Sequence, residues 1–200
     1  MMKKILAPLA VCWLAATPAL AAPEVGKAAP DFTATSASGK TVKLSDYAGK
    51  IVVLEWNNPG CPFVKKFYGS GAMQKQQAAA TAKGIVWLSV NSGAEGNQGH
   101  MNGEEALAFV ADKKAAPTEY LLDCDGTIGH LYGAKTTPHM FVIDNKGKLV
   151  YAGAIDDKAG VNPDEIATAH NYVDAAIAAI MAEKTPEVTT TQSYGCSVKY

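Results

Sequence analysis

Cysteine is the most chemically reactive side chain of this 200-residue sequence, and Cys61 lies in the most suggestive context. It stands in EWNNPGCPFVKK, after an apolar run and directly before Pro62. Proline fits the first turn of a helix, where its missing N–H would have no partner anyway. A thiol at a helix N-terminus meets free N–H groups and a positive partial charge. Both favour the thiolate, which is the form that attacks disulfides and peroxides.

The first 21 residues have the features of a secretory signal peptide. Lys3 and Lys4 precede an apolar run, and residues 19–21 have the small-x-small form of a cleavage site. The apolar run is shorter than the roughly 20 residues that a transmembrane helix needs. We therefore expect an exported protein, periplasmic if it comes from a Gram-negative bacterium, with no membrane attachment after cleavage.

Cleavage would remove Cys12 and leave Cys61, Cys124 and Cys196. An oxidising compartment permits disulfides, but three cysteines leave at least one thiol unpaired within a monomer. Cys124 lies between two aspartates, and neighbouring negative charge raises the pKa of a thiol. We expect Cys124 to be incidental.

The charged residues argue against several classes of partner. All 18 basic residues are lysine, and without the signal peptide 16 lysines face 19 acidic residues, a formal net charge of −3. A weakly acidic chain without arginine is a poor candidate for binding nucleic acid or an anionic membrane. The His-Met pairs at 100–101 and 139–140 lack the helical spacing of ligands, so we expect neither a metal nor a cofactor.

Strands and helices alternate along the rest of the sequence. Buried strands are expected in KIVVLEW and GIVWLSVN, and a shorter one in EYLLDCDG, with a hairpin before them that turns at Ser38-Gly39 and a second hairpin around NKG. Helices are expected over 62–83, with YGSG as a candidate break, in EEALAFVADKK, in TIGHLYGA and, as one final helix, over 162–184. This order predicts a three-layer α/β/α fold with a mixed central sheet and an N-terminal β-hairpin. One domain would cover 22–184, followed by an irregular tail over 185–200 that carries Cys196.

Several of these segments resemble the thioredoxin-like superfamily, specifically its exported redoxin (AhpC/TSA-like) branch. VGKAAPDFTATSASGKTVKLSDYAGKIVVLEW resembles the N-terminal part of such domains, and GCPFVKK resembles the start of the active-site helix. LYGAKTTPHMFVIDNKGKLVYAGAIDD resembles the segment with the cis-proline, and YGCSVKY resembles the C-terminal signature of a redoxin subgroup. The resemblance implies a thioredoxin-like fold and an oxidoreductase with Cys61 as its redox thiol.

The sequence departs from both standard chemistries of that superfamily. Thioredoxins use C-x-x-C, whereas NPGC has Asn58 in place of the first cysteine. Peroxiredoxins use P-x-x-x-T-x-x-C with a distant arginine, and here Leu54 and Asn58 take the proline and threonine places. The Asn58 amide could still bond a peroxide oxygen, but lysine does not replace a planar guanidinium. The substrate stays open between a protein disulfide and a small peroxide, with a slight preference for disulfide exchange.

Cys196 is the better candidate for the second thiol that a redox cycle needs. The 12 residues from Lys184 to Cys196 can extend up to roughly 40 Å, against a radius of gyration of about 16 Å for such a domain. The subgroup resemblance of YGCSVKY points the same way. A separate thiol reductant protein would then reopen the disulfide. The alternative is a non-catalytic binding module in which a structural Cys61–Cys196 bond adds up to about 5 kcal/mol of stability. Pairing with Cys124, or none, also stays open.

The resemblance gives supporting roles to neighbours of Cys61. Pro138 matches the cis-proline that packs on the cysteine, and Thr137 would offer backbone groups to an extended substrate. His139 could act as a base or donor to the thiol, but neighbours in a strand face opposite sides, so we expect it to point away. Glu55 is odd in an apolar strand. It is either a buried proton acceptor near Cys61 or, as we expect, a residue at the exposed end of the strand.

Overall fold

The computed structural model describes residues 22–200, so the predicted signal peptide over 1–21 lies outside the described residues. At its centre is a seven-stranded sheet with the strand order β2-β1-β5-β4-β3-β7-β8. These strands are β1 (Thr33–Ser36), β2 (Thr41–Lys43), β3 (Val52–Trp56), β4 (Val86–Asn91), β5 (Glu119–Leu122), β7 (Met140–Ile143) and β8 (Leu149–Gly153). The three central strands β3, β4 and β5 run parallel, and the others pair antiparallel, so the sheet is mixed as predicted.

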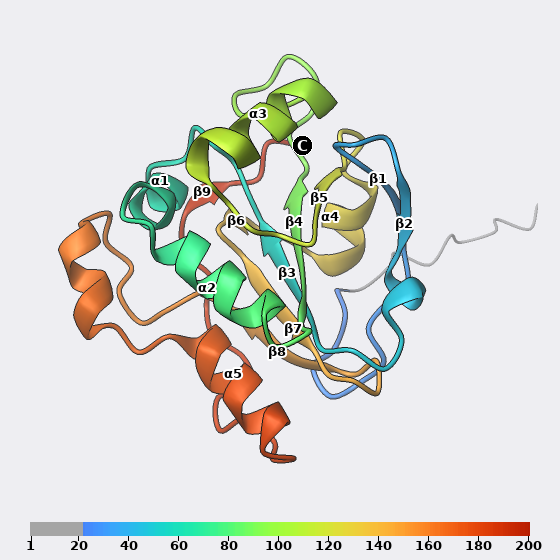
Figure 1. The fold of residues 1–200 in the computed structure, drawn as a ribbon, viewed down its shortest axis with the longest axis vertical. Helices are drawn as coiled ribbons and strands as arrows, with labels where there is room; N and C mark the ends of the chain where they lie inside the picture. The colour runs from blue at the N-terminus through green and yellow to red at the C-terminus, as the bar shows by residue number, and fades with distance from the viewer. Residues whose placement is uncertain (1–21) are drawn as a thin grey trace, which may run out of the picture.

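Helices cover both faces of the sheet (Figure 1). They are α1 (Pro62–Gly69), α2 (Ala72–Thr81), α3 (Gly103–Lys113), α4 (Thr127–Tyr132) and α5 (Tyr172–Met181). One core lies under α1, α2 and α5 and includes Val53 and Trp87, whereas the core under α4 includes Leu54 and Trp56. Successive side chains of β3 thus enter opposite cores, which is why the strand is apolar throughout. The predicted three-layer α/β/α fold is confirmed.

Two antiparallel strand pairs flank the parallel centre. β1 pairs with β2, and Gly39 in the turn between them has a φ of +82°, a left-handed conformation that glycine adopts without strain. β7 pairs with β8 across the residues 144–148 that contain NKG. A short 3-10 helix, η1 (Leu44–Tyr47), follows β2 and leads the chain back to β3.

Both long helical segments are interrupted, the first of them at the YGSG segment. The segment 62–83 divides into α1 and α2, because Gly71 takes a φ of +78° between them. The prediction of one final helix over 162–184 is wrong. That segment forms a 3-10 helix, η2 (Pro163–Thr168), and then α5. Asn162 and Asn171 each cap one of the two with a side-chain oxygen, so the second asparagine starts a new helix.

The C-terminal tail lies along the domain and is irregular apart from one two-residue strand. Thr190 bridges to Ala152 of β8, and the tail then reaches β6 (Thr136–Thr137), where β9 (Cys196–Ser197) pairs with it antiparallel (Figure 1). The register places Cys196 opposite Thr137. None of the helices within residues 22–200 has the length and apolar character needed to span a bilayer.

Candidate active site

Cys61 is the N-cap residue of α1, as the CP pair predicts. Pro62 occupies the first helical turn, and Cys61 has extended backbone angles, with φ −73° and ψ 126°. Its side chain is only 1% exposed. In the thiol form Sγ donates to the carbonyl oxygen of Thr137 at 3.0 Å, so α1 and the segment before Pro138 meet at the sulfur.

The structure packs Cys196 against the core cluster that contains Cys61, within hydrogen-bond reach of its sulfur, and both thiols are free. Burial acts to raise the pKa of Cys61. Hydrogen bonds from the Cys196 side chain, from Thr137 and from the backbone N–H groups of Val64 and Cys196 outweigh it, so this pKa lies below its ordinary value. The pKa of Cys196 is raised to about 11 by burial and by its hydrogen bond and charge interaction with Cys61. Cys61 is therefore the thiol of the pair that ionises more readily, and the Cys196 thiol is a hydrogen-bond donor to its thiolate.

Thr137 and Pro138 form the opposite wall of the site. The Thr137–Pro138 peptide bond is cis, in agreement with the resemblance. The Thr137 hydroxyl is buried and has no hydrogen-bond partner among residues 22–200, so it is available to donate to the sulfur when Cys61 ionises, which lowers the pKa of Cys61. The backbone edge of Thr137, expected to face an extended substrate, is occupied here by β9 of the same chain.

His139 does not contact the thiol in this structure, so a role as its base or donor is not supported. The ring lies 4.4 Å from that of Phe141, which belongs to the core on the α4 side of the sheet. Its Nδ1 accepts a hydrogen bond from the Lys135 N–H at 3.2 Å. Burial, with a smaller effect from Lys135, lowers the pKa of His139 to about 4. The ring is thus a neutral core acceptor, and the expectation that it points away holds.

The Asn58 amide is engaged within the protein rather than free for a peroxide. Its Nδ2 donates to the backbone oxygen and to the side-chain oxygen of Gln98, each at 3.2 Å. Its Oδ1 accepts the Gly60 N–H at 2.8 Å. These contacts hold the turn before Cys61 against the loop that contains Gln98, a partner that no local sequence signal indicates.

Glu55 is fully buried, so the expectation of an exposed strand end is wrong. Its carboxylate accepts five hydrogen bonds of 2.8 to 3.1 Å, from Asn57 Nδ2, Tyr68 Oη, Gln77 Nε2, Trp87 Nε1 and Ser89 Oγ. The donors come from α1, α2, β4 and the turn after β3. A buried carboxylate is tolerated when such donors surround it. None of these contacts reaches Cys61, so Glu55 fastens the elements behind the site together.

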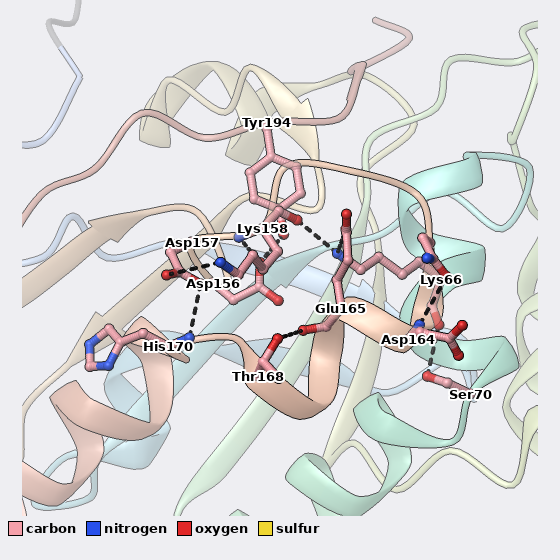
Figure 2. A network of polar contacts seen from close by, with 11 residues as sticks. Lys66, Ser70, Asp156, Asp157, Lys158, Asp164, Glu165, Thr168, His170 and Tyr194 are labelled. Atoms are coloured by element: carbon pink, nitrogen blue, oxygen red, sulfur yellow. Dashed lines mark hydrogen bonds and ion pairs between the residues drawn. The ribbon is translucent and has the colours of Figure 1, made fainter.

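A second polar network holds the segment between β8 and α5 against α1 (Figure 2). The buried Lys66 ammonium donates to the backbone oxygen of Lys158 at 2.7 Å and lies 3.5 Å from a Glu165 oxygen. It therefore faces this segment and is not directed at the sulfur. Asp156 accepts a hydrogen bond from the hydroxyl of Tyr194, two residues before Cys196. The network thus also fixes the tail upstream of the second thiol.

Cys124 plays no part in the site. It is exposed, and burial together with Asp123 and Asp125 raises its pKa above the ordinary value. A raised pKa lowers the thiolate fraction at neutral pH, in line with the expectation of an incidental residue.

Comparison with known proteins decides the family. The AhpC/TSA family pattern matches residues 25–152, which is more than half of the sequence. The chain belongs to the AhpC/TSA family. The match covers Cys61 and the Thr137–Pro138 segment but ends before the tail with Cys196. The family pattern therefore says nothing about the second thiol of this AhpC/TSA chain.

Individual relatives place this AhpC/TSA chain among thioredoxin-like proteins. It is 28% identical over 132 residues to the thiol-disulfide oxidoreductase ResA of Geobacillus thermodenitrificans, a match that spans 62% of this chain and 66% of that protein. It is 31% identical to a protein from Chlorobium tepidum provisionally named thiol:disulfide interchange protein DsbE, with a TM-score of 0.53 over 64% of this chain and 84% of that one. A hypothetical protein from Sinorhizobium meliloti 1021 shares the fold over 90% of this chain and 96% of its own, with a TM-score of 0.75 and 24% identity.

Proposed function

We propose that the protein is an exported thiol-disulfide oxidoreductase in which Cys61 is the attacking thiol and Cys196 the resolving thiol. The observation that carries the proposal is the β6–β9 pairing, which places Cys196 opposite Thr137 and beside the Cys61 sulfur. The names of the ResA and DsbE relatives support the reaction class. The YGCSVKY segment enters the proposal as the element that carries the resolving thiol, and residues 1–21 as its export signal.

The first half of the cycle follows from the two displaced pKa values. The Cys61 thiolate attacks one sulfur of a substrate disulfide, forms a mixed disulfide and releases the other substrate sulfur as a thiolate. Cys196 then gives up its proton and attacks the Cys61 sulfur, which releases the second substrate thiolate and closes the Cys61–Cys196 bond. The substrate has gained two electrons, and the dithiol of the protein has lost them. Since the two thiols are already adjacent, closure needs no large rearrangement.

The second half of the cycle needs a reductant. A dithiol protein attacks the Cys61–Cys196 bond, forms a mixed disulfide and then closes its own disulfide, which returns both cysteines to the reduced state. A lowered pKa makes Cys61 a good leaving thiolate in this step. A small peroxide is the second oxidant to test, because Cys61 has a lowered pKa although Asn58 is engaged with Gln98.

One observation favours the alternative, a binding module with a structural disulfide. Cys61 is 1% exposed in the described structure, and β9 covers the edge of β6 next to it. If the bond only fastens the tail, it will resist dithiol reductants, because structural disulfides have reduction potentials below about −300 mV. A redox site instead requires that β9 leave β6 often enough for a substrate to reach the sulfur.

The test is differential alkylation with mass spectrometry on the mature protein, the Cys61→Ser variant and the Cys196→Ser variant. Protein is fully reduced, treated with one equivalent of oxidised glutathione or of hydrogen peroxide, and then returned to dithiothreitol. We expect Cys61 and Cys196 to move together from alkylated to disulfide-linked and back, and Cys124 to stay alkylated. A pair that dithiothreitol never opens would refute the oxidoreductase and leave the structural disulfide.

A further inference from the structure

The side chain of Tyr200 lies on the surface, 38% exposed, against Gly126, Gly129, His130 and Ala134, which we name the Tyr200 cradle. The His130 ring stacks on the Tyr200 ring, with centroids 4.0 Å apart and planes 24° apart. The hydroxyl donates to the backbone oxygen of Ala134 at 2.8 Å. The ring is therefore held by both its face and its polar end.

The two glycines are what make room for the ring. A Cβ at Gly126 would lie 2.6 Å from Tyr200 Cδ1, and a Cβ at Gly129 would overlap the ring and its hydroxyl. Gly129 lies inside α4, where alanine would be a better helix former than glycine by up to about 1 kcal/mol. Helix formation thus gives no reason for glycine at 129, whereas the Tyr200 ring does.

The backbone around Tyr200 is fixed by two further loops. The N–H of Ala94 donates to the Lys199 oxygen at 2.8 Å, and Asn97 Nδ2 donates to the oxygens of Lys199 and Tyr200 at 3.2 and 3.1 Å. The Val198 N–H donates to the Lys135 oxygen at 3.1 Å. The tail is thus bound on the C-terminal side of Cys196.

A different anchor binds the tail on the N-terminal side of Cys196. The ring of Tyr194 lies 5.9 Å from that of Phe63 in α1, and its hydroxyl donates to Asp156. Between the two aromatic anchors, Gly195 has a φ of +140°, and a Cβ at this position would collide with the Thr137 carbonyl oxygen. Cys196 is therefore held on the β6 edge from both sides, although its own pairing spans only two residues.

We propose that Tyr200 is the positioning residue of the resolving thiol: its ring, held in the Tyr200 cradle, keeps β9 on β6 and thereby keeps Cys196 beside Cys61. The ring touches neither sulfur and acts by raising the effective concentration of one thiol at the other. This inference rests on the proposed function, because a positioning residue matters only where the Cys61–Cys196 bond forms and opens.

The experiment measures the equilibrium between the protein and glutathione. The two protein thiols react with one oxidised glutathione to give the Cys61–Cys196 disulfide and two reduced glutathione molecules. Two electrons pass to glutathione, and the two protein thiol protons end on its thiols. The fraction of oxidised protein across defined glutathione mixtures, read by alkylation and mass spectrometry, gives the equilibrium constant of this reaction.

Gly129→Ala is the decisive variant because it changes no atom of the tail. We expect it to lower the equilibrium constant at least tenfold, as Tyr200→Ala should, since either change releases the ring from its seat. Tyr200→Phe keeps the stacking and should retain most of the wild-type value.

In the Tyr200→Ala background, Gly129→Ala should add almost nothing to the change in the equilibrium constant, since the methyl group then meets no ring. Gly69→Ala is the matched control, because a Cβ at that helical glycine meets no atom within 4 Å.

A second readout separates positioning from general destabilisation. Displacing Cys196 removes a hydrogen bond from the Cys61 sulfur, so the pH midpoint of Cys61 alkylation should rise in Gly129→Ala and Tyr200→Ala but not in Gly69→Ala. If the wild-type disulfide cycles and both cradle variants keep the equilibrium constant within twofold, the inference is overturned. If the wild-type pair does not cycle, the proposed function fails instead. Should Gly129→Ala not fold, Tyr200→Ala, which only removes atoms, decides.

Discussion

Replacing Glu55 with glutamine should strongly destabilise the protein. The glutamine has nearly the same shape, but one carboxylate oxygen becomes an NH2 group that must face donors. Asn57 Nδ2 and Tyr68 Oη both donate to Glu55 Oε1. If the NH2 group takes the place of this oxygen, the Tyr68 hydroxyl can rotate to accept a hydrogen bond from it. The NH2 group of Asn57 is only a donor, so its hydrogen bond is lost. The four remaining bonds lose their ionic partner, and hydrogen bonds to charged groups contribute about 1.5–3 kcal/mol each against about 1 for neutral ones. We expect a loss of roughly 3–5 kcal/mol in the free energy of unfolding.

Urea unfolding followed by far-UV circular dichroism measures this change. Tryptophan fluorescence is a poor sole probe, because Trp87 itself donates to Glu55. Glu187→Gln is the matched control, since Glu187 is exposed and surface substitutions usually change stability by no more than about 0.5 kcal/mol. A loss below about 1 kcal/mol in Glu55→Gln would refute a fivefold-bonded buried carboxylate. An unchanged stability combined with a shifted pH midpoint of Cys61 alkylation would instead make Glu55 a proton acceptor for the thiol.

Three further predictions concern the other groups around the site. Cys196→Ala should raise the pH midpoint of Cys61 alkylation by stopped-flow, because a donor to the thiolate is lost; an unchanged midpoint would mean that the thiols do not interact. Thr137→Val should shift that midpoint in the same direction with little change in Tm, and a downward shift would contradict donation by the hydroxyl. The pKa of His139 falls from 6.5 to about 4 on folding, so the unfolded chain binds more protons in this window, and stability should be complete above pH 6.5 and fall as the pH drops toward 4. Urea unfolding should show a loss of up to about 3 kcal/mol from this residue, and His139→Asn should unfold with a correspondingly flatter pH dependence.

The sequence was informative wherever a local pattern reflects burial. The apolar runs that became β3 and β4 predict strands covered on both faces, and helices do cover both. The CP pair predicts a helix start, and Cys61 is the N-cap of α1. The final helix was mispredicted because apolar spacing continues across Asn171, and the capping role of that asparagine depends on where its side chain turns.

The arrangement of the site depends on contacts that no local pattern encodes. Glu55 was expected at an exposed end because burying a carboxylate is costly, and its cost is met by donors up to 34 residues away in the sequence. The β9 strand spans two residues, too short for any alternation of apolar and polar side chains. It is held from both sides by contacts between distant residues, such as Tyr194 with Phe63 and Tyr200 with Gly129, which meet only in the folded protein.

The distance along the chain between the two thiols has a consequence for biogenesis. Cys61 emerges long before Cys196 during synthesis, and if the chain is exported as proposed, it enters an oxidising compartment unaccompanied. In that compartment the first thiols available to Cys61 belong to Cys124 or to other proteins. Disulfides that Cys61 forms at this stage would therefore be non-native. The cradle that receives Tyr200 lies over residues 126–134, all of which precede the tail in the chain. The Tyr200 cradle would then be in place before the tail is synthesised. Docking of the tail would bring the Cys196 thiol to Cys61, where it can displace any other disulfide partner by thiol-disulfide exchange.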